Sequence, residues 1–243
     1  GAGSSTECIA FGGYEPALSA KTEYYNGTSW TEVADLATAV AGSFGAGTAT
    51  AAVSAGGAAP SVTTATEKFT AATTATVLQE GQVWYNTTST VLKGFGLSIA
   101  GGSWASGGAM NTARRRGICA GTQTAAICAG GYNTEAETEL YNGTAWTEVN
   151  DMNTGRDQGG NNWGTNAASL FASGATTPWP NQVGNTEKWD GTSWTEVNNV
   201  NTARRNTSGA GTVTAAVLGA GGDPAKANTE TYDGTSWTET NDL

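Results

Sequence analysis

Histidine is absent from this chain of 243 residues, and charged residues make up only 13% of it. Histidine is the commonest general base of enzymes and the commonest side chain that binds transition metals, so the usual forms of both kinds of site are excluded. Lys and Arg number 11 against 21 Asp and Glu, which gives a formal net charge of −10. Phosphate backbones repel such an acidic surface, so a nucleic-acid partner is not expected.

Cysteines are also few, and long apolar runs are missing. The three cysteines are Cys8, Cys119 and Cys128, and an odd number without regular spacing argues against a disulfide framework. Cys119 and Cys128 could face each other across a hairpin that turns near Gln123-Thr124, but buried free thiols are the expectation. No run of 18 apolar residues occurs, so insertion into a membrane is not expected.

A six-residue phrase recurs along the chain, as Tyr-Asn-Gly-Thr-Ser-Trp at 25–30 and as close variants at 141–146, 189–194 and 232–237. Each copy is followed by Thr-Glu, and upstream of each lies a small apolar run that usually ends in Gly-Gly. A repeat of about 40–45 residues with this pattern predicts an all-β fold, a β-propeller. The nine Trp and seven Tyr residues provide large side chains for a core.

Four strands are expected in each unit. The innermost follows an Asn-Thr-Ala-Arg phrase (111–114 and 201–204, and weaker forms at 153–156 and 37–40) and contains Gly and Ala, which suit strands that converge on an axis. The third and fourth strands form a hairpin whose Asn-Gly or Asp-Gly dipeptides predict two-residue type I′ turns. Four tryptophans that end the phrase should then be buried between blades: Trp30, Trp146, Trp194 and Trp237.

Two further units are expected where the phrase is degenerate. Residues 69–77 align with 25–33 and place Thr74 at the tryptophan position, and residues 99–104 align with 25–30. Residues 1–243 are therefore expected to form one domain of six four-stranded blades with a short third blade. The alternative is five blades with residues 71–98 as an insertion. The six units are centred on Trp30, Thr74, Trp104, Trp146, Trp194 and Trp237.

The two ends of the sequence match the repeat at different points. Residues 1–3 match the end of an inner strand, and Asp242-Leu243 match the exit from an outer strand. Between those landmarks the other units hold eight residues, as in 37–44. The chain is therefore expected to lack one inner strand, as though cut from a longer array. Those residues would come from contiguous sequence or a neighbouring copy, or residues after Asp242 would fold back.

The order of diglycine, Tyr and Trp resembles the Kelch propeller family. Longer phrases, EGQVWYNTTSTVLKGF at 80–95, SWASGGAMNTAR at 103–114 and the NGTSWTEV copies, resemble Kelch-like repeat proteins of marine tailed phages over nearly the whole chain. Such proteins are generally assigned to tail fibres or other virion appendages. The resemblance implies an extracellular, virion-borne propeller whose partners are other appendage subunits and a host-surface glycan or protein. Kelch copper oxidases use Tyr, His and Cys ligands that have no counterpart here, and no cofactor or metal is expected.

Catalysis is not expected either. The glutamates of the Thr-Glu pairs recur with the repeat, as structural residues do, whereas a catalytic pair should break the symmetry. They are expected at solvent-facing strand positions, paired with the arginines of the Asn-Thr-Ala-Arg phrases. Residues 150–157 echo an oxygen-rich calcium loop, but the repeat accounts for most of this stretch.

Residues that depart from the repeat are the candidates for binding. Trp163 and Trp179 have no counterparts in other units, and both are expected on loops, more exposed than the repeat tryptophans; the alternative is that they cap the edge of a blade. Two basic clusters are expected near one axial opening, where they would hold an acidic glycan or a neighbouring subunit, or pair with the glutamates. They are Arg114, Arg115 and Arg116, and Arg204 and Arg205. The predicted function is a non-enzymatic binding module of a tail appendage, with a purely structural module as the alternative.

Overall fold

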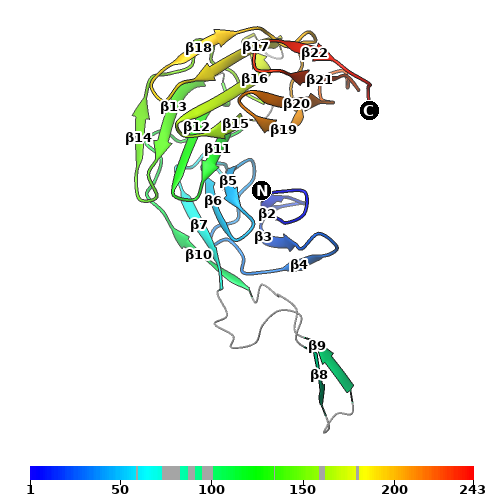
Figure 1. Ribbon diagram of the computed structural model, residues 1–243. Coiled ribbons are helices and arrows are strands. Elements are labelled where there is room, and N and C mark those ends of the chain that lie inside the picture. Colours follow the sequence, from blue (N-terminus) through cyan, green and yellow to red (C-terminus); the bar gives the residue numbers. More distant parts are fainter. Residues whose placement is uncertain are drawn as a thin grey trace.

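The computed structural model describes residues 1–58, 60–72, 83–86, 91–94, 101–133, 135–158, 162–178 and 181–243. Every helix or strand among them is a β-strand (Figure 1). Five antiparallel sheets have four strands each, and β8 (Val83–Asn86) and β9 (Val91–Gly94) form a separate pair. The expected all-β, propeller-like architecture is confirmed. None of the described residues forms a helix that could cross a membrane.

We number the four-stranded sheets as blades 1 to 5 in chain order. Blade 1 contains β1 (Ala2–Gly3), β2 (Cys8–Tyr14), β3 (Leu18–Tyr25) and β4 (Trp30–Glu32). Blade 2 contains β5 (Phe44–Thr48), β6 (Ala51–Ala55), β7 (Thr66–Ala71) and β10 (Gly102–Ser106). Blade 3 contains β11 (Ile118–Thr122), β12 (Ala125–Gly131), β13 (Glu135–Tyr141) and β14 (Trp146–Val149). Blade 4 contains β15 (Asn162–Thr165), β16 (Ala168–Thr176), β17 (Asn181–Trp189) and β18 (Trp194–Val197), and blade 5 contains β19 (Ser208–Thr212), β20 (Ala215–Gly219), β21 (Thr229–Tyr232) and β22 (Trp237–Glu239).

The described residues form five blades, so the expectation of six is wrong. The difference arises in blade 2, whose outer strand is β10. Trp104 of β10 pairs with Phe69 of β7, just as Trp146 pairs with Tyr141 in blade 3. The residues assigned to a short third blade therefore complete the second one, and the strand pairing supports the alternative of five blades with an insertion. Thr74 lies outside the described residues.

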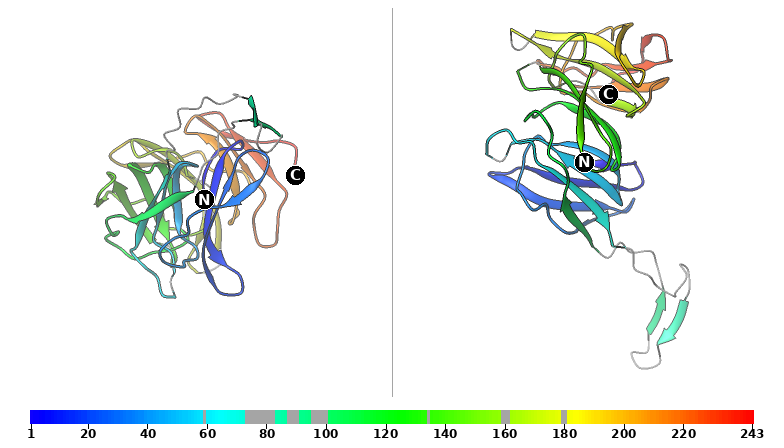
Figure 2. Two further views of the ribbon diagram at one scale, coloured as in Figure 1. Left: turned by 90° about the horizontal axis from the view of Figure 1, so that it is seen from below. Right: turned by 90° about the vertical axis from the view of Figure 1, so that its left-hand side faces the viewer.

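The blades follow one another along an arc, and their inner strands lie near its centre (Figure 1). Seen from the side, the blades succeed one another in chain order (Figure 2, right). In order, β1 contacts β5, β5 contacts β11, β11 contacts β15, and β15 contacts β19. These strands line a central hollow of about 560 Å³, largely with glycine and alanine. At Gly47, where φ is +110°, a Cβ atom would lie 2.2 Å from the Ala51 carbonyl oxygen, so this position requires glycine. The expected inner strands, rich in glycine and alanine, are therefore present.

Blades 1 and 5 form the two ends of the arc (Figure 1), and no strand pairing joins them among the described residues. The expectation that one blade lacks its inner strand is wrong, because β1 pairs with β2 through Ala2 and Gly3. This strand is only two residues long.

The hairpins between third and fourth strands lie where expected, but their turns are not of type I′. Tyr25 pairs with Trp30, so the loop comprises residues 26–29, and within it only Gly27 has a positive φ, +90°. A type I′ turn needs positive φ at both central residues. Instead, the Asn26 side-chain oxygen accepts hydrogen bonds from the backbone N–H groups two and three positions later, both at 2.9 Å. The same contacts recur at Asn142, Asp190 and Asp233.

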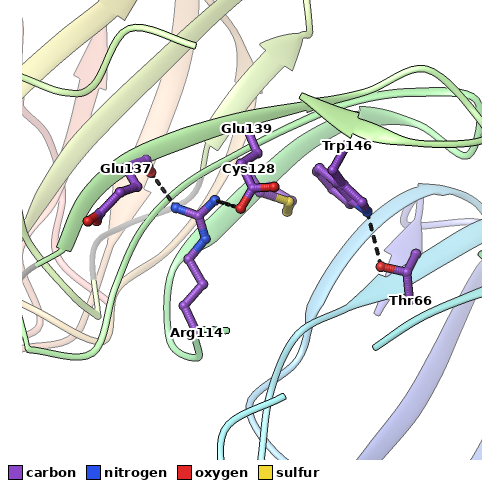
Figure 3. Close-up of a disulfide and its surroundings, with 7 residues drawn as sticks. Thr66, Arg114, Cys128, Glu137, Glu139 and Trp146 are labelled. Atoms are coloured by element: carbon purple, nitrogen blue, oxygen red, sulfur yellow. Dashed lines mark hydrogen bonds and ion pairs between the residues drawn. A yellow bond between two sulfur atoms is a disulfide. The ribbon is translucent and has the colours of Figure 1, made fainter. Parts of the chain in front are cut away.

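Tryptophans of the outer strands join a blade to the blade before it. The indole Nε1 of Trp146 in blade 3 donates a hydrogen bond to Thr66 Oγ1 of blade 2 at 3.0 Å (Figure 3). Trp194 of blade 4 donates to Thr138 of blade 3 at the same distance. These rings fill apolar clusters with residues of the preceding blade, which explains why the tryptophan repeats once per blade.

The expected burial of the four repeat tryptophans is confirmed for three of them. Trp146, Trp194 and Trp237 are 5–6% exposed, whereas Trp30 is 50% exposed. Trp30 belongs to blade 1, and no blade precedes it among the described residues. The expectation is therefore wrong at this position, because the burial of each ring depends on the neighbouring blade rather than on its own.

A disulfide joins Cys119 and Cys128, where free thiols were the expectation (Figure 3 labels Cys128). The two residues are directly opposite in the ladder between β11 and β12, and their Cα atoms lie 4.2 Å apart. Directly opposed residues of an antiparallel pair place their side chains together on one face. Cys8 is the free cysteine.

Titration of thiols in denaturant should distinguish the bonded pair from free thiols. We expect one reactive thiol per unreduced chain, from Cys8, and three after reduction. The Cys8→Ser variant should give no signal before reduction. Three thiols in the unreduced wild-type chain, after purification without reductant, would contradict the disulfide.

Candidate functional site

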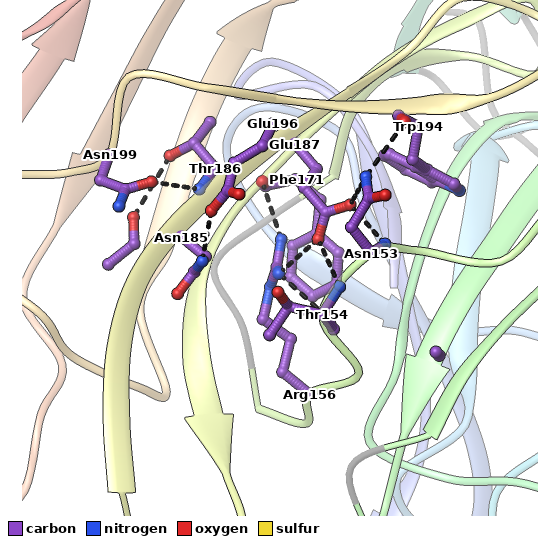
Figure 4. A network of polar contacts seen from close by, with 12 residues as sticks. Asn153, Thr154, Arg156, Phe171, Asn185, Thr186, Glu187, Trp194, Glu196 and Asn199 are labelled. Atoms are coloured by element: carbon purple, nitrogen blue, oxygen red, sulfur yellow. Dashed lines mark hydrogen bonds and ion pairs between the residues drawn. The ribbon is translucent and has the colours of Figure 1, made fainter.

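A buried glutamate in each of blades 3, 4 and 5 holds the segment that leads into the inner strand. In blade 4, Glu187 accepts hydrogen bonds from the backbone N–H groups of Asn153 and Thr154, at 2.7 and 3.2 Å (Figure 4). Arg156 donates to the same carboxylate at 2.7 Å, and both side chains of this ion pair are fully buried. The Asn153 side chain bonds both Glu187 and the Trp194 carbonyl oxygen. Corresponding contacts join Asn111, Thr112 and Arg114 to Glu139, and Asn201, Thr202 and Arg204 to Glu230.

These contacts explain why the Asn-Thr-Ala-Arg phrase recurs, since its backbone and its Asn and Arg side chains bind the buried glutamate. They also show which arginines are buried inside the blades. The guanidinium of Arg156 lies 4.4 Å from the centre of the Phe171 ring and donates to the Phe171 carbonyl oxygen. Burial lowers the pKa of Arg156, and the charge of Glu187 opposes this effect. The expectation of solvent-facing glutamates is wrong for Glu139, Glu187 and Glu230, which are fully buried, although their pairing with arginine agrees with it. Arg114 and Arg204 are buried in these pairs and cannot contact a ligand at the surface.

Arg116 and Arg205, at the end of the blades where the inner strands begin, help to surround a cavity of about 430 Å³. Arg116 precedes β11, Gln158 precedes β15 and Arg205 precedes β19, so blades 3, 4 and 5 each contribute one of these three side chains to the lining. Tyr132 and Asn133 enter from the loop after β12, and Thr177 from the loop after β16. We call this cavity the three-blade pocket.

The backbone at the three-blade pocket is tied together from blade to blade. The Arg116 carbonyl oxygen accepts a hydrogen bond from the Gln158 N–H at 3.1 Å, and the Gln158 carbonyl oxygen accepts one from the Asn206 N–H at 2.8 Å. All three residues have positive φ, +61°, +46° and +53°. Left-handed backbone is uncommon for residues other than glycine and is found at functional sites more often than elsewhere. The side chains at this repeated position are therefore presented by a fixed main chain.

Charged and aromatic groups meet in this pocket. The guanidinium carbons of Arg115 and Arg116 lie 4.3 and 5.4 Å from the centre of the Tyr132 ring, which is 37% exposed. Arg205 forms an ion pair with Asp223 at 2.6 Å and donates to the Gln158 side chain at 2.9 Å. The pocket therefore combines an aromatic ring with guanidinium groups.

Asp157 is the buried carboxyl group of the pocket. Burial raises its pKa, and the positive charges of Arg116 and Arg205 oppose that shift. Its surroundings are thus guanidinium groups, which disfavour a bound cation. The stretch 150–157 that echoes a calcium loop does not gather carboxylates here, and the described residues contain no cluster of three or more potential metal-binding side chains.

The two unusual tryptophans do not form an exposed patch. Trp163 lies in the inner strand β15, is only 3% exposed, and packs against Trp237 with ring centres 5.9 Å apart. The expectation of a loop position is wrong for Trp163, because residues 162–165 occupy the place of the inner strand. Trp179 lies outside the described residues.

Several pocket residues were not singled out from the sequence. Tyr132 follows the diglycine at 130–131, as Tyr14 follows the diglycine at 12–13, so its place in the repeat was a usable signal. Gln158 lies two positions after the buried Arg156, as Arg116 lies two after Arg114. The pocket can hold a planar or saccharide group against the ring of Tyr132 and an anion against the arginines.

Comparison of the chain with protein-family models and with curated proteins found no match.

Proposed function

We propose that this chain is a non-enzymatic, Kelch-like propeller of a phage tail appendage that binds an acidic glycan of the host surface in the three-blade pocket. The observation that carries the proposal is the meeting of Arg116, Tyr132 and Gln158 from two blades around one cavity. The proposed setting, on a virion outside the cell, rests on the resemblance of the repeat phrases to phage proteins. The disulfide between Cys119 and Cys128 supports that setting, because disulfides persist in oxidising environments.

The chemistry of the pocket suits a sugar that carries a carboxylate or sulfate. The partly exposed ring of Tyr132 offers an apolar face and a hydroxyl group to a sugar ring. The guanidinium of Arg116 can make two parallel hydrogen bonds to a carboxylate or sulfate. The hydrogen-bonded backbone of Arg116 and Gln158 keeps these groups in place before binding, which lowers the entropy cost of association.

A glycan array that contains carboxylated, sulfated and neutral saccharides tests the proposal. We expect binding to acidic members, with a loss of about tenfold or more for Tyr132→Ala and for Arg116→Asn, since an ion-pair or stacking contact of about 1.4 kcal/mol corresponds to tenfold. Asparagine tolerates the positive φ at position 116, so the backbone should be preserved. Tyr14→Ala is the matched control, because Tyr14 follows the equivalent diglycine and is 72% exposed far along the arc from the arginines. Equal loss in the Tyr14 and Tyr132 variants, or no binding to any acidic glycan, would contradict the proposal.

A purely structural role in an appendage is the second candidate. It is favoured by Trp30, whose ring is half exposed at one end of the arc. The other repeat tryptophans are buried against the blade before their own. Light scattering separates the two functions: an assembly module should form concentration-dependent oligomers that Trp30→Ala weakens. A chain that stays monomeric and binds acidic glycans would support the binding function alone.

A further inference from the structure

At one position of the repeat, blades 3 and 5 have an arginine whereas blade 4 has a carboxylate. The position is defined by its main-chain carbonyl oxygen, which accepts a hydrogen bond from a backbone N–H near the end of the second strand of the same blade. The length of this bond is 2.8 Å at Arg115, 2.9 Å at Asp157 and 2.6 Å at Arg205. Asp157 therefore takes the place of an arginine in blade 4, and it lines the three-blade pocket.

The side chain of Asp157 is enclosed and lacks a partner. It is 1% exposed, and its Oδ1 accepts no hydrogen bond from the part of the chain that the structure describes. Backbone hydrogen bonds with Ala175 in both directions, at 3.0 and 2.9 Å, fix its main chain. Burial raises the pKa of Asp157, and the positive charges of Arg116 and Arg205 oppose this effect. The carboxylate thus acts on the pocket through its charge rather than by offering an exposed group to a ligand.

The charged side chains of the pocket leave one positive charge over. The described lining residues include two arginines, Arg116 and Arg205, against one carboxylate, Asp157. Just outside the lining, Arg115 and Asp223 carry opposite charges, so the balance is unchanged. Arg205 is held in its ion pair with Asp223. Arg116 is exposed, and no carboxylate of the described residues lies within ion-pairing distance of it, so its guanidinium is available to an anion.

We propose that Asp157 makes the three-blade pocket selective for sugars with one negative charge, on a carboxylate or sulfate ester, over sugars with a doubly charged phosphate monoester. This inference rests on the proposed function, because it names which acidic glycans the same site accepts. A singly charged group matches the single positive charge of the lining. A second charge on the ligand adds to the cost of leaving water and is repelled by the enclosed carboxylate of Asp157.

The inference is tested with sugars that differ only in the acidic group at C6. The uronate, the 6-sulfate and the 6-phosphate of glucose, galactose and mannose are coupled through C1 to an array. Binding is measured at about pH 8, where a phosphate monoester carries close to two charges because its second pKa is about 6. We expect the wild-type chain to bind the uronate or the 6-sulfate of at least one sugar about tenfold or more tightly than the 6-phosphate of that sugar.

Two variants decide whether the charge of Asp157 causes this preference. Asp157→Asn removes the charge at almost unchanged size, and Gln158→Arg adds a guanidinium at the position that Arg116 has in blade 3, where the backbone φ is also positive. Each change adds one positive charge to the lining, so the affinity for the 6-phosphate should rise by about tenfold and the preference should shrink. Asp151→Asn removes an exposed carboxylate of the same segment that does not line the pocket, and it should leave the preference unchanged.

The outcomes separate this inference from the proposed function. If the wild-type chain binds uronates or 6-sulfates but binds the 6-phosphates as tightly, the inference is overturned and the proposed function stands. The same holds if the Asp157→Asn and Gln158→Arg variants, shown by circular dichroism to be folded, keep the preference of the wild-type chain. If the wild-type chain binds no uronate and no 6-sulfate, the proposed function fails and this inference fails with it.

Discussion

Replacement of Glu187 by alanine is expected to lower the free energy of unfolding by about 3–5 kcal/mol, because it leaves the buried Arg156 without its counter-charge. It also removes the acceptor of the backbone N–H groups of Asn153 and Thr154. Denaturation in urea gives the loss from the shift of the midpoint at constant slope. No comparable loss follows from an ordinary surface glutamate, so the expected effect is specific to the enclosed site.

Two variants make this result interpretable. Glu23→Ala changes the equivalent residue of blade 1, which is exposed and unpaired among the described residues, and should cause only a small fraction of the loss. The double variant Arg156→Met with Glu187→Gln should lose less unfolding free energy than the sum of the two single variants. Glu187→Gln alone leaves Arg156 as a buried charge without a counter-charge, and Arg156→Met removes that charge. Equal losses of unfolding free energy for Glu23→Ala and Glu187→Ala would contradict the conclusion that the buried contacts of Glu187 stabilise the fold.

Replacement of Trp194 by alanine is expected to cost about 3–5 kcal/mol of unfolding free energy, the range found for large buried aromatic residues. Its ring is 5% exposed, belongs to the apolar cluster between blades 3 and 4, and donates a hydrogen bond to Thr138. Urea denaturation followed by circular dichroism measures the loss. The Trp194→Phe variant keeps most of the apolar contact and should retain a smaller cost from the unpaired Thr138 hydroxyl, about 1–3 kcal/mol.

Trp30→Ala is the control for this result, since it removes the same residue of the repeat at the open end of the arc. The ring is half exposed, so its removal should cost clearly less than that of Trp194. If the Trp30 and Trp194 variants lose the same stability, the tryptophans act within their own blades and the contact between blades is not what they stabilise.

The candidate site was predictable in part. The arginine runs at 114–116 and 204–205 identified one end of the blades, and Arg116 and Arg205 do meet there. Tyr132 and Gln158 join them because loops of neighbouring blades converge, and this convergence depends on the rotation between blades. The burial of Trp163 was missed, although a usable signal was present: Gly164-Thr165 repeats the Gly-Thr pair that ends the inner strands of blades 2, 3 and 5, and Trp163 directly precedes this pair.

The sequence by itself determined the repeat, the all-β class, the small residues of the inner strands and the tryptophan of the outer strands. Glycine, alanine and tryptophan recur at the spacings that a four-stranded unit requires. Only the tertiary structure decided the number of blades, since the pairing of Phe69 with Trp104 spans residues 70–103. It also decided the bond between Cys119 and Cys128, which depends on strand register, and the exposure of Trp30, which depends on an adjacent blade. The pairing of Phe69 with Trp104 and the contacts between blades join residues that are distant in the chain, and local spacing carries no information about which distant residues will meet. Cys119 and Cys128 are only nine residues apart, and there the register of one hairpin decides.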